Sequence, residues 1–141
     1  MTFLTRLNLP ENHVEGEIPS SIGKLCYLMH FDISSNNVTG TISEILKGTD
    51  CLSRKPLPSL QDLDLSSNNL VGKLPEWLGQ PKNLVELHLL YNSRHGPIPA
   101  SLGLTKILSV LWLGRNELNG TLLESLGQLS KLILLMVLPI I

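Results

Sequence analysis

The sequence is poor in aromatic residues, in cysteine and in net charge. Phe, Trp and Tyr make up 4% of its 141 residues, and only Cys26 and Cys51 carry a thiol. The formal net charge is −1, so the composition gives no electrostatic basis for binding nucleic acid. With so few aromatic side chains, leucine has to fill the core, which is typical of a narrow one.

Long apolar runs are also missing. The longest, Leu132–Ile141, covers 10 residues, whereas a membrane-spanning helix needs about 20. Residues 1–10 contain no apolar stretch of the kind that marks a secretory signal. We therefore expect neither a transmembrane segment nor a signal peptide within this chain.

One pattern repeats along nearly the whole chain, and residues 60–75, LQDLDLSSNNLVGKLP, show it most clearly. Its leading leucines are Leu4, Leu28, Leu60, Leu84, Leu108 and Leu132, at a constant interval except between Leu28 and Leu60, where the interval is longer. The same spacing holds for Asn12, Asn36, Asn68, Asn92 and Asn116, and for Gly16, Gly40, Gly72, Gly96 and Gly120. Repeats of this length are typical of solenoids, so we expect a single domain over residues 1–141.

Each repeated position has a physical reason. In Leu-x-x-Leu-x-Leu, alternation by two places leucines inward, which predicts short strands near residues 6–9, 30–33, 62–65, 86–89 and 110–113. The asparagine lies inward at the end of the strand, where a buried amide must bond to backbone groups of adjacent turns. We therefore expect the five asparagines to form a buried ladder, followed by glycines that allow a backbone conformation closed to other residues.

This pattern closely resembles the plant-type leucine-rich repeat, whose form is LxxLxxLxLxxNxLxGxIPxxLGxLxx. Its most specific part is L-x-G-x-I-P, and three of the five complete copies keep the proline, as Pro19, Pro75 and Pro99. The run LDLSSNNLVGKLPEWLG is most similar to ectodomains of plant receptor-like proteins and receptor-like kinases. The resemblance implies an α/β repeat fold. This would be a right-handed solenoid with a parallel β-sheet on its concave face and short helical or irregular connections on its convex side.

Three features depart from the regular pattern. The second repeat carries an insertion at about residues 46–59, which should bulge from the outer side without breaking the stack. Arg94 occupies an inward place, so we expect either a locally weakened turn or an arginine that reaches the rim. The sixth repeat begins at Leu132 and has no asparagine. Because both ends leave core and strand edges uncovered, we expect the chain to be part of a longer array.

The resemblance also implies a function. It points to non-catalytic binding of a peptide or protein ligand, with a co-receptor kinase as a further partner. The setting would be defence or developmental signalling at the extracellular face of the plasma membrane, as part of a longer receptor. A secreted inhibitor similar to polygalacturonase-inhibiting proteins, located in the apoplast, is the alternative, and a hydrolase is a more distant one. The sequence has no nucleophile elbow, metal-ligand spacing or phosphate loop, so we expect no enzyme, cofactor or metal site.

The outward positions of the predicted strands vary from copy to copy, while the inward positions do not. Solenoids usually bind their partners on the extended concave surface that such positions form. Tyr91, Trp112 and Arg115 are residue types enriched at binding hot spots. The expected ligand-binding residues are Asp64, Glu86, His88, Tyr91, Trp112 and Arg115.

Two further kinds of site depend on position in the repeat. Cys26 and Cys51 fall near matching places of adjacent repeats, and neighbouring turns lie roughly 5 Å apart, within reach of a disulfide. Two free thiols are the alternative. The sequons at Asn37 and Asn119 flank inward residues and should point outward, so both are expected glycosylation sites if the chain is secreted.

Overall fold

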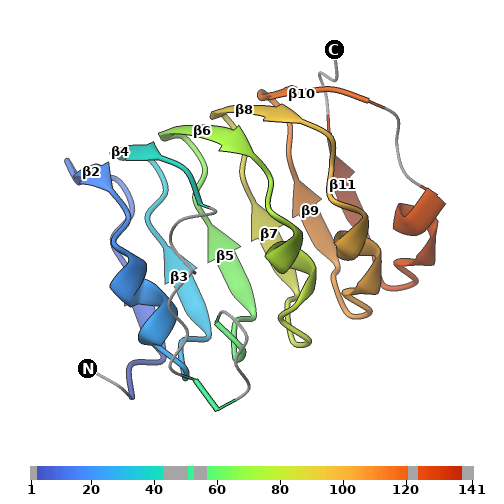
Figure 1. Ribbon diagram of the computed structural model, residues 1–141, viewed down its shortest axis with the longest axis horizontal. Helices are drawn as coiled ribbons and strands as arrows, with labels where there is room; N and C mark the ends of the chain where they lie inside the picture. Colours follow the sequence, from blue (N-terminus) through green and yellow to red (C-terminus); the bar gives the residue numbers. More distant parts are fainter. Residues whose placement is uncertain (1–2, 43–50, 53–56, 121–123, 138–141) are drawn as a thin grey trace.

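The computed structural model describes residues 3–42, 51–52, 57–120 and 124–137 of the chain. These residues wind through stacked turns, one for each repeat (Figure 1). Most of the insertion expected at about residues 46–59 lies outside the described residues.

The first sheet confirms the predicted repeat solenoid. Its six parallel strands are β1 (Arg6–Asn8), β3 (His30–Asp32), β5 (Asp62–Asp64), β7 (Glu86–His88), β9 (Val110–Trp112) and β11 (Leu134–Met136), in that order. Neighbouring strands pair at equivalent places of the repeat, as Arg6 with His30. The insertion does not change this register, because His30 still pairs with Asp62, its equivalent on the far side of the extra residues. The sixth, incomplete repeat still supplies a strand.

A second parallel sheet lies along the opposite edge of each turn, and the sequence pattern did not predict it. Its strands are β2 (Glu15–Glu17), β4 (Asn37–Gly40), β6 (Asn69–Lys73), β8 (Ser93–Gly96) and β10 (Glu117–Leu118). They are short, and all but β10 contain the repeated glycine, which is depleted in strands, so local propensity argues against them. Glu15 pairs with Asn37, which comes two places before its equivalent in the next repeat. The second sheet therefore slides by two residues from turn to turn.

The convex side is made of short 3₁₀ helices, as the resemblance implied. They are η1 (Ser20–Lys24), η3 (Glu76–Gly79), η4 (Ala100–Leu104) and η5 (Glu124–Gln128). Pro19, Pro75 and Pro99 precede the first three in extended conformation, which ends the strand and begins the helical turn. The helices pack closely enough that a Cβ on Gly79 would lie 2.1 Å from the Ser101 carbonyl oxygen of the next turn.

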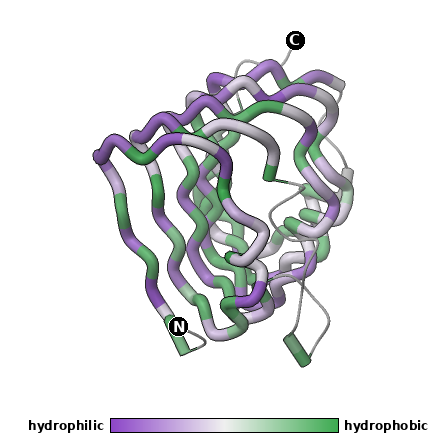
Figure 2. The backbone as a smooth tube through the Cα atoms, turned by 60° about the vertical axis from the view of Figure 1, so that its left-hand side comes forward, coloured by the Kyte–Doolittle hydropathy of each residue, from purple (hydrophilic) through white to green (hydrophobic). Residues whose placement is uncertain are grey.

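The core is a narrow column of leucines between the two sheets, with the repeated asparagines at its edge. Hydrophobic and hydrophilic residues alternate along the turns (Figure 2). Asn68 shows the expected ladder: its side-chain amide donates to the Ile33 carbonyl of the preceding turn (3.0 Å) and to Leu65 of its own turn (3.2 Å). Its Oδ1 accepts from the Val38 N–H at 3.0 Å. Backbone groups of two turns are thereby satisfied by one side chain.

The ladder is buried at four positions, Asn36, Asn68, Asn92 and Asn116. The prediction that Asn12 belongs to it was wrong. Asn12 is exposed, and its amide donates to Pro10 O within the same turn. No described turn precedes it, so it has no neighbouring backbone to bridge.

Arg94 does not reach the rim as one reading of the sequence expected. Its side chain is fully buried. Nη1 donates to the Val71 carbonyl at 3.1 Å, while Nε and Nη2 have no partner among the described residues. Burial lowers the pKa of the Arg94 guanidinium from its ordinary value to about 10. The guanidinium stays in the core because the inward backbone position directs it there, and it is only partly satisfied.

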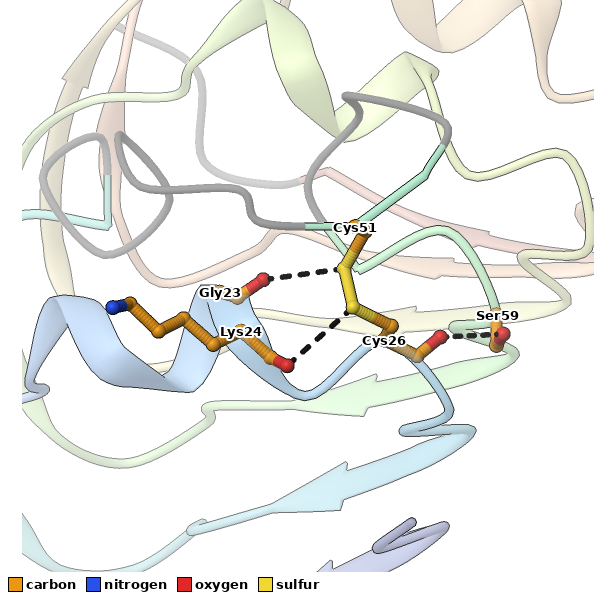
Figure 3. Close-up of a disulfide and its surroundings, with 5 residues drawn as sticks. All are labelled: Gly23, Lys24, Cys26, Cys51 and Ser59. Carbon is orange, nitrogen blue, oxygen red and sulfur yellow. Dashed lines mark hydrogen bonds between the residues drawn. A yellow bond between two sulfur atoms is a disulfide. The ribbon is translucent and has the colours of Figure 1, made fainter. Parts of the chain in front are cut away.

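Cys26 and Cys51 form a disulfide beside η1, with their Cα atoms 5.5 Å apart (Figure 3). Cys51 is buried. Next to the bridge, the Ser59 hydroxyl donates to the Cys26 carbonyl at 2.8 Å. The bridge ties the middle of the insertion to the first turn and the hydrogen bond ties its end there, so the stack continues past the extra residues.

Candidate functional site

The outward face of the first sheet carries a polar hollow of about 330 Å³. It extends over the first four strands. Its charged and polar lining residues are Arg6, Asn8, His30, Asp32, Asp62, Asp64, Glu86 and His88. Four carboxylates against one arginine make the hollow negative, so it favours cationic groups of a ligand.

Two histidine–carboxylate pairs organise the hollow. His30 Nδ1 pairs with Asp62 Oδ2 of the neighbouring strand, its direct partner in the sheet. His88 Nε2 lies 2.9 Å from Glu86 Oε2, two residues before it on the same strand. Both pairs arise because outward positions alternate along a strand and stand side by side across parallel strands.

Two aspartates of the central outward column also serve the fold. Asp32 Oδ1 accepts from the backbone N–H and hydroxyl of Ser34, at 2.9 and 2.7 Å. Asp64 Oδ1 accepts from the Ser66 N–H at 2.9 Å. Each aspartate therefore fixes the turn that follows its strand. Because this bond uses Oδ1, the second carboxylate oxygen of Asp64 can accept from a ligand in the hollow.

The same column changes character in the next two turns. The places held by Asp32 and Asp64 are held by His88 and Trp112, which cannot cap the turn through a carboxylate. The two rings meet edge to face, with centroids 4.7 Å apart and planes at 74°. The indole N–H of Trp112 is buried without a partner in the described part of the chain. No contact within the described turns satisfies this indole N–H, and a buried donor without a partner marks a candidate binding position.

Tyr91 and Arg115 stand in the turns just after β7 and β9, with φ of 52° and 55°. The left-handed conformation recurs at this place in every complete repeat, at Glu11, Ser35, Ser67, Tyr91 and Arg115. A large non-glycine residue in this region costs on the order of 1 kcal/mol. Tyr91 is 56% exposed, so burial of its ring does not offset that cost.

The structure places the predicted ligand-binding residues on neighbouring turns. It brings Asp64, Glu86, His88 and Trp112 together on β5, β7 and β9, and places Tyr91 and Arg115 just after two of these strands. The hollow also extends over β1 and β3, where the prediction named no site residue: Arg6, Asn8, His30 and Asp32, with Asp62 beside them. The matching places of His30 and Asp62 in successive repeats could have revealed their pairing.

Other expected sites can be placed on the same turns. Asn37 begins β4 and Asn119 follows β10, and both are exposed. Within the described residues, no group of three or more His, Cys, Asp or Glu side chains is arranged to hold a metal ion. No helix in the described part of the chain is long and apolar enough to span a membrane. The arrangement can hold charged and aromatic groups of a ligand by contact.

The comparisons with known proteins agree with this architecture. The Leucine Rich Repeat family model matches residues 3–25, 27–49 and 59–81. Among curated proteins, none matches the chain by sequence.

Several solved structures are similar over most of the chain. One is the plant peptide hormone receptor RGFR1 in complex with RGF2, with 31% identity and a TM-score of 0.85 over 96% of this chain and 20% of that chain. The PEPR1–AtPEP1 structure has 30% identity and a TM-score of 0.86 over 97% of this chain and 18% of that chain. A third is the Arabidopsis receptor kinase HAESA in complex with the peptide hormone IDA and the co-receptor SERK1. It has 35% identity and a TM-score of 0.79 over 91% of this chain and 20% of that chain. The chain spans about a fifth of the length of these structures.

Proposed function

Because the chain belongs to the leucine-rich-repeat family and its structure matches plant receptor ectodomains, we propose that it binds an extended peptide across β5, β7 and β9. The observation that carries the proposal is the change in the outward columns. The second and third turns have aspartate and serine there, whereas the fourth and fifth turns have His88, Tyr91, Trp112 and Arg115, and His88 itself lines the negative hollow. These four residues are not needed by the repeat.

In this proposal each group has its own role. Basic side chains of the peptide meet the Asp64 and Glu86 carboxylates in the hollow. An apolar side chain packs on Trp112, while a carboxylate of the peptide pairs with the Arg115 guanidinium in a bidentate, charge-assisted contact. Truncating an anchor of this kind typically costs about 2 kcal/mol or more.

The similar structures support this assignment of ligand and partner. RGFR1 is in complex with RGF2, and HAESA is in complex with the peptide hormone IDA and the co-receptor SERK1. By analogy, the chain acts without catalysis as a ligand-binding part of a longer receptor at the extracellular face of the plasma membrane, in defence or developmental signalling. A co-receptor kinase is its second partner, and Asn37 and Asn119 carry glycans. Loss of mass on enzymatic deglycosylation of secreted protein, abolished by Asn37→Gln with Asn119→Gln, tests the last point.

The test of binding uses a peptide selected from a random display library on the immobilised chain. Its affinity is measured by calorimetry for the wild type, Trp112→Ala and Asp64→Asn, with Lys106→Ala on an exposed connection as the matched control. We expect a loss of at least about 30-fold for Trp112→Ala, corresponding to about 2 kcal/mol, and an unchanged affinity for Lys106→Ala. Equal affinities of these two variants would refute the proposed site.

A further inference from the structure

The polar hollow contains four carboxylates over β3, β5 and β7, and each has one oxygen engaged in the fold. They are Asp32, Asp62, Asp64 and Glu86. Oδ1 of Asp32 and of Asp64 accepts from the turn that follows its strand. Oδ2 of Asp62 and Oε2 of Glu86 pair with histidines. The other oxygen of each carboxylate has no hydrogen-bond partner among the described residues.

The two histidines of the hollow are held through opposite ring nitrogens. His30 meets Asp62 through Nδ1, and His88 meets Glu86 through Nε2 at 2.9 Å. An ionised carboxylate only accepts hydrogen bonds, so in the neutral imidazole the nitrogen that meets it carries the hydrogen. The remaining nitrogens, Nε2 of His30 and Nδ1 of His88, are then acceptors.

The free polar side-chain atoms that line the hollow over these three strands are therefore all acceptors. Asp32 pairs in register with Asp64, and Asp62 with Glu86, so carboxylates stand side by side on strands about 4.8 Å apart. Arg6, on β1, also lines the hollow but forms no ion pair within the described part of the chain. It therefore leaves these acceptors available to a ligand.

We propose that the hollow over β3, β5 and β7 is a subsite for a guanidinium group, so that the basic residue of the bound peptide is an arginine and not a lysine. This subsite presupposes the peptide binding proposed above and specifies its chemistry. A guanidinium is planar, carries five N–H donors in a fixed fork and accepts no hydrogen bond. It can therefore donate to carboxylates on two neighbouring strands at once.

The histidines distinguish this subsite from a surface that attracts any cation. Carboxylates alone favour an ammonium as well as a guanidinium, because both carry one positive charge. The two imidazole acceptors add directional hydrogen bonds without adding charge, so they favour the group with more donors. An ammonium has only three donors and is more strongly hydrated, so it satisfies fewer of the acceptors and costs more to desolvate.

Small ligands test the subsite independently of any peptide. N-acetyl-arginine amide, N-acetyl-lysine amide and N-acetyl-citrulline amide are titrated into the isotope-labelled full chain at about pH 8, where an unperturbed imidazole is neutral. We expect the arginine compound to shift backbone amides of β3, β5 and β7 with a Kd at least about fivefold below that of the lysine compound. The uncharged citrulline compound should not saturate. Equal affinities for arginine and lysine, or no shifts with arginine, would overturn the proposal.

Amide variants test which side chains hold the guanidinium. Asp62→Asn and Glu86→Gln each remove a charge and introduce donors into the hollow, so each should weaken binding of N-acetyl-arginine amide at least about fivefold. Glu117→Gln, at an exposed carboxylate on β10 of the second sheet, is the matched control and should leave the affinity unchanged. Equal affinities of all three variants would contradict the proposed contacts.

The ring tautomers can be measured on the unaltered chain, which keeps the proposal testable even if a variant does not fold. Long-range nitrogen–proton spectra of the histidine rings at about pH 8 should show hydrogen on Nδ1 of His30 and on Nε2 of His88. The opposite tautomer at either ring would place a donor in the hollow and overturn the proposal.

A peptide selected on the immobilised chain separates this subsite from the proposed peptide site. It should contain an arginine whose replacement by lysine weakens binding at least about tenfold. If Trp112→Ala weakens binding but this replacement does not, the guanidinium subsite is wrong and the peptide site stands. If N-acetyl-arginine amide binds as expected but Trp112→Ala leaves the affinity for the peptide unchanged, the peptide site is wrong and the guanidinium subsite stands.

Discussion

In the first sheet, equivalent places of successive turns lie side by side, whereas in the second sheet they do not. Asp64 pairs with His88, and His88 with Trp112, each at the same place of its repeat. In the second sheet, Lys73 pairs with His95, and His95 with Glu117, and each partner comes two places before the equivalent residue. Only the first sheet therefore forms straight outward columns along the solenoid. An extended ligand that lies across the strands can therefore contact one residue of a column in each turn.

The two sheets also differ in how tightly they constrain residue type. In the second sheet, the glycine of one turn lies under a side chain of the turn before it. A Cβ on Gly40 would lie 2.9 Å from Glu17 Cγ, and a Cβ on Gly72 would lie 2.9 Å from Thr41 Cγ2. On the first sheet, the outward side chains range from aspartate to tryptophan on the same backbone. The second sheet thus acts as the scaffold, and the first sheet is free to carry recognition.

The largest expected effect is at the asparagine that joins the sheets. Asn68→Ala removes amide bonds to Ile33 O and Leu65 O and the bond from Val38 N–H, so we expect a loss of about 3 kcal/mol in the free energy of unfolding. The matched control is Asn12→Ala, an exposed residue, with a loss below about 0.5 kcal/mol. Urea denaturation of dilute protein measures both. Similar losses would show that the ladder does not hold the turns together.

A glycine pair separates backbone strain from packing between turns in the second sheet. Gly72 and Gly16 have φ of 83° and 84°, but a Cβ on Gly16 would meet nothing within 4 Å. We expect Gly16→Ala to cost about 1 kcal/mol through backbone strain alone. Gly72→Ala should cost about 2–3 kcal/mol, because Thr41 must also move. Adding Thr41→Ser to Gly72→Ala removes the methyl group that the new Cβ would meet, so it should recover part of the lost stability in the same denaturation experiment. If it recovers none, packing against Thr41 does not contribute to the cost.

Replacing the buried Arg94 should stabilise the fold, in contrast to the two preceding kinds of substitution. Arg94→Leu restores the residue type found at Leu70 and Leu118 and removes a partly satisfied charge, so we expect stability to rise by about 2 kcal/mol. Since burial lowers the pKa of Arg94 to about 10, the penalty is present in full below about pH 10 and declines only above it. Arg115→Leu, at an exposed arginine, is the control and should change the midpoint of urea denaturation little. Destabilisation by Arg94→Leu at neutral pH would mean that the guanidinium is a net support.

The smallest expected effect concerns the concave columns. Tyr91→Asn keeps φ of 52° but replaces tyrosine with a residue that tolerates the left-handed region, so stability should rise by about 0.5 kcal/mol. Affinity for a selected peptide should fall at the same time. Calorimetry with Lys106→Asn as control measures the second effect. A drop in stability together with unchanged affinity would place Tyr91 in the scaffold.

The strands of the first sheet and the buried ladder could be predicted because inward leucines and asparagines repeat in phase. The second sheet could not, since its strands are short, all but β10 contain glycine, and they pair with a two-residue slide that the repeat length does not reveal. The position of Arg94 followed from its place in the repeat, but the direction of its long side chain did not. For the site, the columns were readable, whereas the extent of the hollow depends on how side chains such as His30 and Asp62 pair across strands.

The most direct test of recognition on the first sheet is a map of backbone amide chemical shifts as a selected peptide is titrated into the labelled chain. We predict that the largest shifts cluster at β5, β7 and β9 and at Tyr91 and Arg115. Shifts clustered instead on β4, β6 and β8 of the second sheet would contradict it, because the ligand would then lie on the scaffold.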